Sequence, residues 1–271
     1  MPAAFGRPAR VVPMPDIEFS QLTDPGRVRS ENEDAIGHWP HDDGLVFAVA
    51  DGLGGHAAGE VASSLALEVL AREMERAPGS WPVAKRLHRA VREANLELYN
   101  KAIVVPELRG MGTTITATAI VGASVVAAHV GDCRLFLVRE GVGKQLTKDH
   151  TWVWEQVQYG RLSPEQARVH PKRHNITRCL GRELLTAIDM LSFDLLPGDV
   201  LAQMSDGIHA ALPEAEIVEL LNTHPPESAC QALIRRGLDE GGADNLSVQV
   251  AAIRSCPPPT SAGRPWWRFG R

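Results

Sequence analysis

Five aspartates stand in short polar segments at widely separated places in the chain, most of them beside a glycine. They are Asp34 in RSENEDAIG, Asp51 in VADGLGG, Asp132 in HVGDCR, Asp206 in MSDG and Asp244 in GGADN. A single Asp-Gly pair is ordinarily a turn signal. The repetition instead indicates carboxylates gathered at the rim of a sheet, where glycine lets the backbone come close to whatever is bound.

Carboxylates that converge without cations repel one another, and a hard divalent metal relieves that repulsion. Because the motifs offer oxygen ligands without His or Cys, Mg²⁺ or Mn²⁺ is favoured over zinc. Two such ions about 3.5–4 Å apart would activate a water and hold a phosphoryl oxygen. Arg29, five residues before Asp34, could then clamp the phosphate with two hydrogen bonds. Taken alone, Arg29 would be interpreted as part of a surface ion pair.

The elements that must position these residues follow from the hydrophobic pattern. The order is strand, two helices, several strands, two helices and a last strand, without the strict alternation of a parallel α/β fold. We therefore expect antiparallel sheets packed together, with helix pairs outside. The predicted strands are 17–22, 45–52 ending at Asp-Gly, the hairpin 113–121 and 124–130, 134–138, one within 195–207, and 246–253. The predicted helices follow apolar positions at 62–74, 87–98, 217–221 and 229–233.

Composition limits the class of protein. The chain has 271 residues, 44% hydrophobic and 23% charged, with a net charge of −5 and a pI of about 6.1. These values exclude a disordered chain, a collagen, a disulfide scaffold and a nucleic-acid binder held by bulk charge. No apolar run reaches the roughly 18 residues of a membrane helix, and the N-terminus lacks the apolar core of a secretory signal. A cytoplasmic location is therefore expected.

The four cysteines do not suggest a site of their own. They are far apart and form no C-x-x-C pair, which argues against zinc and against a redox dithiol. They are interpreted as buried or incidental thiols: Cys133, Cys179, Cys230 and Cys256.

Six segments, in this order, carry a family resemblance. They are RVRSENEDAIG, VFAVADGLGGHAAGEVAS, GMGTTITATAI, HVGDCRLFLV, MSDGI and GGADNLSV. Together they resemble the metal-dependent serine/threonine protein phosphatases of type 2C in their bacterial form. The resemblance runs from about Ile17 to Ile253, and 170–181 resembles the block near the mobile flap of that family.

The resemblance implies an α+β fold: a four-layer α-β-β-α sandwich of two antiparallel sheets flanked by helix pairs. It divides the chain into an N-terminal leader at 1–16, a phosphatase domain at 17–253 with a flap around 150–178, and a Pro/Arg/Trp-rich tail at 254–271. The tail aromatics Trp266, Trp267 and Phe269 are expected to pack on the surface of the domain, and the alternative is a docking tail.

The resemblance also implies the metal ligands. Asp51 would bridge two Mn²⁺ or Mg²⁺ ions, and Gly52 would give its carbonyl to one of them. Asp206 and Asp244 would be the remaining ligands of the other ion. Asp132 would hold a third, weaker ion.

Three further residues acquire roles from the resemblance. Glu33 and Asp34 would hold metal-bound waters, and Arg29 would bind the phosphate. Some eukaryotic members have a histidine directly after the Asp-Gly, whereas this chain has Leu53 there and His56 three residues later. The preferred proton donor is therefore a metal-bound water. Expected substrates are phosphoserine and phosphothreonine in proteins, with a serine/threonine kinase and its substrates as partners. Neither nucleic acid nor a membrane span is expected, and the chain is expected to be monomeric.

Two other functions fit parts of the sequence. Gly52-x-Gly54-x-x-Ala57 after a strand fits a dinucleotide-binding pattern, but Asp51 would place negative charge beside the pyrophosphate and the middle of the chain predicts antiparallel strands. A binding protein on the same fold with lost chemistry should lack the metal carboxylates, which are present here. Ser205 lacks the G-x-S-x-G context of a serine hydrolase.

Overall fold

Two antiparallel sheets form the centre of the molecule. The computed structural model describes residues 14–41, 44–54 and 58–258. One sheet has the order β1-β11-β10-β7-β8 and the other β2-β3-β5-β6-β9, with β4 paired to β3. The strands of the first sheet are β1 Asp16–Asp24, β11 Leu246–Ser255, β10 Val200–Met204, β7 Arg134–Arg139 and β8 Val142–Gln145. Those of the second are β2 Asp34–His41, β3 Gly44–Leu53, β4 Gly112–Thr113, β5 Ile115–Val121, β6 Ser124–Val130 and β9 Asp189–Asp194.

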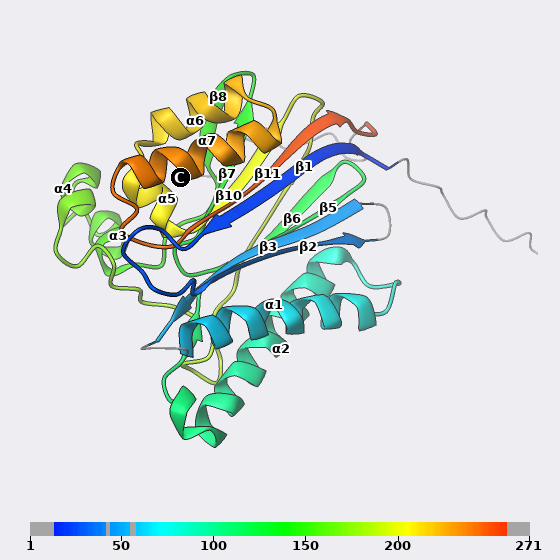
Figure 1. Cartoon of the computed structure of the whole chain (residues 1–271). Helices are drawn as coiled ribbons and strands as arrows, with labels where there is room; N and C mark the ends of the chain where they lie inside the picture. Colours follow the sequence, from blue (N-terminus) through cyan, green and yellow to red (C-terminus); the bar gives the residue numbers. More distant parts are fainter. Residues whose placement is uncertain (1–13, 42–43, 55–57, 259–271) are drawn as a thin grey trace, which may run out of the picture.

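Helices cover the outer faces of both sheets (Figure 1). Helices α1 Ala58–Arg76 and α2 Val83–Val104 pack on the second sheet. Helices α5 Asp206–Ala211, α6 Glu214–Thr223 and α7 Pro226–Asp239 pack on the first. A short 3-10 turn, Pro106–Leu108, follows α2. The four-layer α+β sandwich expected from the sequence is thus confirmed, and the antiparallel sheets do not fit the dinucleotide-binding alternative.

The core has three apolar layers, because each sheet buries both of its faces. Side chains from the two sheets meet between them, among them Phe47, Leu137 and Leu201. In α1 the buried positions recur at helical spacing, including Ala62, Ala66 and Leu70. This spacing places one apolar stripe of the helix against β3 and leaves its other face to solvent.

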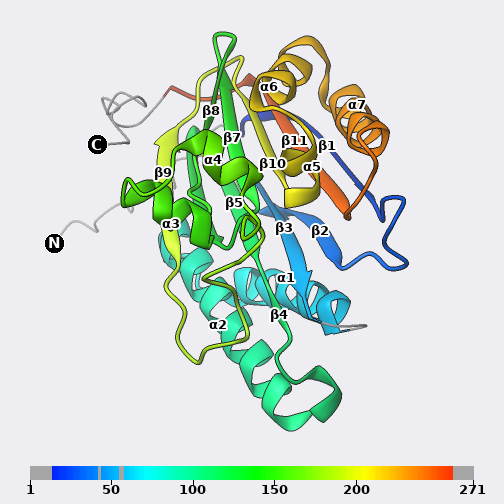
Figure 2. The ribbon, with the colours of Figure 1, turned by 90° about the vertical axis from the view of Figure 1, so that its left-hand side faces the viewer.

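A separate segment between β8 and β9 forms two short helices, α3 Trp152–Gln158 and α4 Pro164–Val169. A bridge between Thr151 and Ile176 closes its base, together with a hydrogen bond of 2.8 Å from the Thr177 N–H to the His150 carbonyl. Figure 2 shows both helices in front of the sheets. We call residues 151–177 the flap.

Some sequence predictions need adjustment. The strand predicted to stop at Asp51-Gly52 continues to Leu53, because Gly52 and Leu53 pair with β4. Strands β2, β8 and β9 were not predicted, since their short sequences contain polar or proline residues. Three of the four cysteines are buried and all are free thiols. The tail aromatics Trp266, Trp267 and Phe269 lie outside the described residues, as do most of the leader and His56.

Candidate metal and phosphate site

Asp51 lies opposite Asp34 in the register of β3 and β2. Directly opposed residues of an antiparallel pair place their side chains on one face of the sheet. The main chain of Asp51 is fixed on its other side. Its carbonyl accepts hydrogen bonds from the Thr114 N–H and the Thr113 hydroxyl, both 2.8 Å, and its N–H donates to Thr114 Oγ1 at 3.1 Å. The two threonines therefore hold Asp51 in place. The strand predicted over 113–121 is interrupted at Thr114, which lies between β4 and β5.

Gly52 has no room for a side chain. Its N–H donates to the Glu33 carbonyl at 3.0 Å, and a Cβ would lie 2.1 Å from the Gly59 carbonyl oxygen. The Glu33 carboxylate in turn lies against Gly59 in the first turn of α1, where a Cβ would meet Glu33 Oε1 at 2.4 Å. Two glycines thus let strand, loop and helix approach one another beside Asp51.

Asn245 joins the loop before β2 to the start of β11. Its side-chain amide donates to the carbonyls of Pro25 and Glu31, both at 2.9 Å, and its Oδ1 accepts the Glu33 N–H at 2.8 Å. Asn245 is 5% exposed, so these bonds are shielded from water. They bring Glu33 next to Asp244. Sequence reasoning missed this residue, and its only signal was its place beside Asp244 in GGADN.

Ser205 connects the two sheets beneath the site. Its hydroxyl donates to Asp34 Oδ2 at 2.7 Å and accepts the Ser247 N–H at 3.1 Å. The next residue, Asp206, begins α5. The sequence excluded Ser205 as a hydrolase nucleophile but did not reveal this positioning contact, which links residues 171 positions apart.

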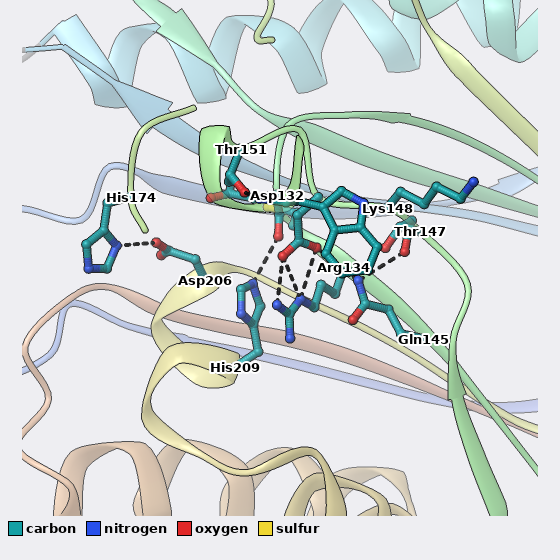
Figure 3. A network of polar contacts seen from close by, with 12 residues as sticks. Asp132, Arg134, Gln145, Thr147, Lys148, Thr151, His174, Asp206 and His209 are labelled. Carbon is teal, nitrogen blue, oxygen red and sulfur yellow. Dashed lines mark hydrogen bonds and ion pairs between the residues drawn. The ribbon is translucent and has the colours of Figure 1, made fainter. Parts of the chain in front are cut away.

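Asp132 lies in the turn between β6 and β7, after Gly131 with φ of 110°. The His209 ring Nε2 donates to its carbonyl oxygen at 2.9 Å, which ties the turn to α5 (Figure 3). The Asp132 Oδ1 atom is buried without a hydrogen-bond partner. Sequence reasoning did not identify His209, which lies one helical turn after Asp206.

His150 holds the same turn from the base of the flap. Its ring Nδ1 accepts the Gly131 N–H at 2.9 Å, and its main-chain N–H donates to the Gly131 carbonyl at 2.7 Å. The other ring nitrogen, Nε2, lies 3.0 Å from Arg178 Nη1 and 3.3 Å from Asp189 Oδ2. Sequence reasoning missed His150 as well, because no local motif marks it.

Arg29 and Asp244 form an ion pair at the mouth of the site, with Arg29 Nη2 3.0 Å from Asp244 Oδ2. The Arg29 side chain is 49% exposed, so a ligand can reach the guanidinium. The pKa of Arg29 is raised, chiefly by Asp244 and also by Glu33 and Asp206. The structure thus brings Arg29 to the same acidic cluster that the separate motifs supply.

The carboxylates of the cluster act on one another. Burial raises the pKa of Asp51 well above its ordinary range, and Asp206, Asp34, Asp132 and Asp244 all raise it further. Burial likewise raises the pKa of Asp132, and Asp206 adds to the rise.

Two other carboxylates show how hydrogen-bond donors oppose this effect. Burial raises the pKa of Asp34 to about 7, against the hydrogen bond from Ser205. Burial would raise the pKa of Asp206 too, but it is lowered overall by His174 and His209. His174 Nδ1 of the flap lies 3.7 Å from Asp206 Oδ2 (Figure 3).

This arrangement suits divalent cations. Buried carboxylates with raised pKa values and an unpartnered Asp132 oxygen are the donors that a hard cation satisfies. Within 14–41, 44–54 and 58–258, no three His, Cys, Asp or Glu side chains are grouped closely enough to hold an ion by themselves.

Comparison with known proteins agrees with this fold. A family model described as protein phosphatase 2C matches residues 27–247. The chain belongs to the protein phosphatase 2C family, and it shares the fold of solved members.

Three relatives illustrate the similarity. The serine/threonine protein phosphatase PstP of Mycobacterium tuberculosis is 37% identical over 238 residues, covering 88% of this chain and 45% of PstP. The chain therefore spans about half the length of this relative. The serine/threonine phosphatase stp of Listeria innocua is 36% identical, covering 83% and 92%. A crystal structure of the PstP catalytic domain in complex with two manganese ions has a TM-score of 0.78 at 34% identity, covering 88% and 98%.

Proposed function

We propose that this protein is a metal-dependent phosphatase that hydrolyses phosphoserine and phosphothreonine in proteins. The observation that carries the proposal is the set of aspartates around the buried Asp51 that each raise its pKa: Asp34, Asp132, Asp206 and Asp244. Family membership and the manganese-bound relative support it. The direct test is hydrolysis of a phosphothreonine peptide by the purified chain with Mn²⁺, beside a phosphotyrosine peptide. No hydrolysis of phosphothreonine would overturn the proposal.

Asp51, the Gly52 carbonyl, Asp206 and Asp244 would hold two Mn²⁺ or Mg²⁺ ions, with Asp132 for a third. When bound, the ions lower the pKa of a water and polarise the phosphoryl group. Hydrolysis breaks the bond between phosphorus and the serine or threonine oxygen, and that oxygen takes up a proton as it leaves.

The protein's own residues orient the reactants. Glu33 and Asp34 are placed to accept hydrogen bonds from waters, because Asn245 and Ser205 fix their positions. Arg29, which Asp244 holds at the mouth, is placed to pair with phosphate oxygens.

Arg29→Ala is expected to raise KM for a phosphopeptide about 10- to 100-fold while metal binding stays unchanged. Each charge-assisted hydrogen bond lost costs about 1.5–3 kcal/mol, and 1.4 kcal/mol corresponds to a factor of ten. Steady-state kinetics with a Mn²⁺ titration measure both effects. Arg27→Ala, a nearby exposed arginine, is the control. Unchanged kinetics in the Arg29 variant would remove this residue from the site.

Asp132→Ala is expected to keep the two tighter ions and lose most of its turnover, because a third ion would orient a water without anchoring the others. Kinetics and calorimetric Mn²⁺ titration test this. If Asp132 only stabilised the turn, the variant would instead lose about 1 kcal/mol of stability and keep normal turnover. Wild-type turnover at every Mn²⁺ concentration would contradict the third-ion role.

The stability of the chelated, metal-free protein should depend on pH through Asp34. The folded-state pKa of about 7 exceeds the ordinary 3.8, so between these pH values the folded state retains a proton that the unfolded chain releases. The stability that Asp34 contributes is therefore full below about pH 3.8 and is lost as pH rises through about 7. His129 and His209, whose pKa values burial lowers to about 4, act oppositely below about pH 6.5.

Comparing wild type with Asp34→Asn cancels these histidine contributions. The melting temperature of the variant, relative to wild type, should rise by several degrees between pH 5 and pH 8, since about 1 kcal/mol shifts a domain of this size by roughly 2–4 °C. Thermal melts in chelator measure it. A difference that does not change with pH would contradict the raised pKa.

We also infer that the protein opposes a serine/threonine kinase in the cytoplasm and acts as a monomer. The names of the relatives support a role in reversing serine and threonine phosphorylation. Within the described residues, no helix is long and apolar enough to cross a membrane. Comparing phosphoproteins in cells with and without the active enzyme tests the kinase relationship, and sedimentation of the purified chain tests the monomer.

A further inference from the structure

A cavity of about 510 Å³ extends from the carboxylate site between the flap and α5. Asp132 and Asp206 line one end. The flap contributes Val153, Trp154 and Ala167, and the end of α5 with the following loop contributes 210–213. Its volume lies in the range of sites that take ligands much larger than a phosphoryl group. The cavity therefore has room for part of the molecule that carries the phosphate.

Positive charge is concentrated at the flap side of this cavity. Arg168 and Arg173 line it and are exposed. Arg134 also lines it, but its guanidinium is already bound to Asp149, with Nη2 2.7 Å from Oδ2. In the described parts of the chain, neither Arg168 nor Arg173 makes a side-chain hydrogen bond or ion pair. Both are thus available to an anionic ligand.

Acidic groups also lie near these arginines, and most of those that line the cavity belong to the carboxylate site or are already paired: Asp132, Asp206, and Asp149, which is bound to Arg134. The pKa of Glu165, a fully exposed residue on the same helix, is lowered by the Ser163 side chain and to a smaller extent by Arg168. Glu214 lines the wall of the cavity formed by the start of α6. The flap, residues 151–177, contains four Arg or Lys residues and two acids, Glu155 and Glu165. The flap therefore presents net positive charge beside the phosphate site.

The wall between these arginines and the carboxylate site is largely apolar. Val153, Trp154, Ala167, Leu212 and Pro213 line it. Among the residues that the structure describes, the buried Trp154 indole N–H has no hydrogen-bond acceptor. A carbonyl or carboxylate of a ligand in the cavity is the kind of acceptor that would satisfy it. The cavity thus combines apolar contact, a lining tryptophan whose buried indole N–H is unpartnered within the described residues, and two free guanidinium groups.

We propose that this cavity is a subsite for the substrate chain next to the phosphorylated residue, and that it selects a segment with an anionic group. Arg168 and Arg173 pair with that group, which is either a carboxylate side chain or a second phosphoryl group. The apolar wall contacts the rest of the segment. The inference rests on the proposed phosphatase activity and names the substrate class of that site.

The test compares phosphothreonine peptides whose flanking residues are glutamate, alanine, lysine or a second phosphothreonine. The wild-type enzyme with Mn²⁺ should prefer the glutamate peptide to the lysine peptide by about tenfold in kcat/KM, since two exposed ion pairs contribute up to about 1 kcal/mol each. The double variant Arg168→Glu/Arg173→Glu should reverse this order. Comparing the glutamate and second-phosphothreonine peptides distinguishes the two sources of negative charge.

Arg161→Glu is the matched control, because Arg161 is on the flap but does not line the cavity. It should retain the wild-type preference. Ala210→Trp, which places an indole in the cavity from its exposed edge, should lower kcat/KM for all the peptides. Hydrolysis of p-nitrophenyl phosphate, which has no peptide chain, should stay within about twofold in every variant.

The outcomes separate this inference from the proposed function. Full p-nitrophenyl phosphate hydrolysis with no preference among the peptides would overturn the subsite alone. The subsite would also be overturned if Arg161→Glu changed the peptide preference as much, per charge reversed, as the double variant does. The preference would then depend only on the total charge of the flap. No Mn²⁺-dependent hydrolysis of any substrate by the wild-type enzyme would overturn the proposed function and the subsite together.

Discussion

Asp51→Asn is expected to lower turnover of a phosphothreonine peptide by a factor on the order of 10³ or more, a loss of about 4 kcal/mol of transition-state stabilisation. The reason is that Asp51 is at the centre of the cluster, where burial and each of the other four aspartates raise its pKa. Asparagine keeps the shape of the side chain but removes the charge that would join two cations. Steady-state kinetics and calorimetric Mn²⁺ titration measure the two losses.

The same variant should not be less stable in chelator at pH 8. Removing a buried carboxylate whose neighbours oppose its charge relieves repulsion, so its melting temperature should equal or exceed that of the wild type. This separates lost chemistry from lost folding. Asp239→Asn, an exposed aspartate at the end of α7, is the control for removing one negative charge. Near-normal turnover of the Asp51 variant would contradict the two-ion mechanism.

Stripping the metals should abolish hydrolysis completely, and adding Mn²⁺ or Mg²⁺ should restore it. The side chains that could act as nucleophiles near Asp51 are engaged in the structure. The Ser205 hydroxyl donates to Asp34, and the Thr113 hydroxyl donates to the Asp51 carbonyl. Burial also raises the pKa of the Cys133 thiol, and the surrounding aspartates raise it further.

The experiment assays a phosphothreonine peptide after dialysis against chelator, then after stepwise addition of Mn²⁺. Circular dichroism of the stripped protein is the control for folding. Re-addition should restore at least most of the initial rate. Full activity in the stripped, folded enzyme would show that a protein side chain carries out the attack, which would overturn the proposed mechanism.

Local sequence determined much of the architecture, because period and turn chemistry are short-range properties. Apolar residues at helical spacing predicted α1, and alternating β-branched residues predicted β5 and β6. The strand β2 was missed, since its polar residues and Pro40 hide the pattern. Its place in the sheet depends on pairing with β3, which no window of the sequence around β2 contains.

In the candidate site, too, the sequence indicated some of the residues and left others unidentified. The residue types and their glycine neighbours were enough to indicate oxygen ligands for hard cations, and the ordered motifs indicated the family. The residues that hold those ligands in place were not visible. Asn245 binds the Glu33 N–H across 212 positions, and His209 binds the Asp132 carbonyl across 77.

These contacts have no local signature because a hydrogen bond between distant segments requires only one donor and one acceptor brought together by the fold. The same holds for the cavity between the flap and α5, whose facing walls come from residues about 30–60 positions apart. The sequence by itself thus determined which chemistry the carboxylates could support. Only the packing of the two sheets, α5 and the flap decided how they are positioned and which surface lies beside them.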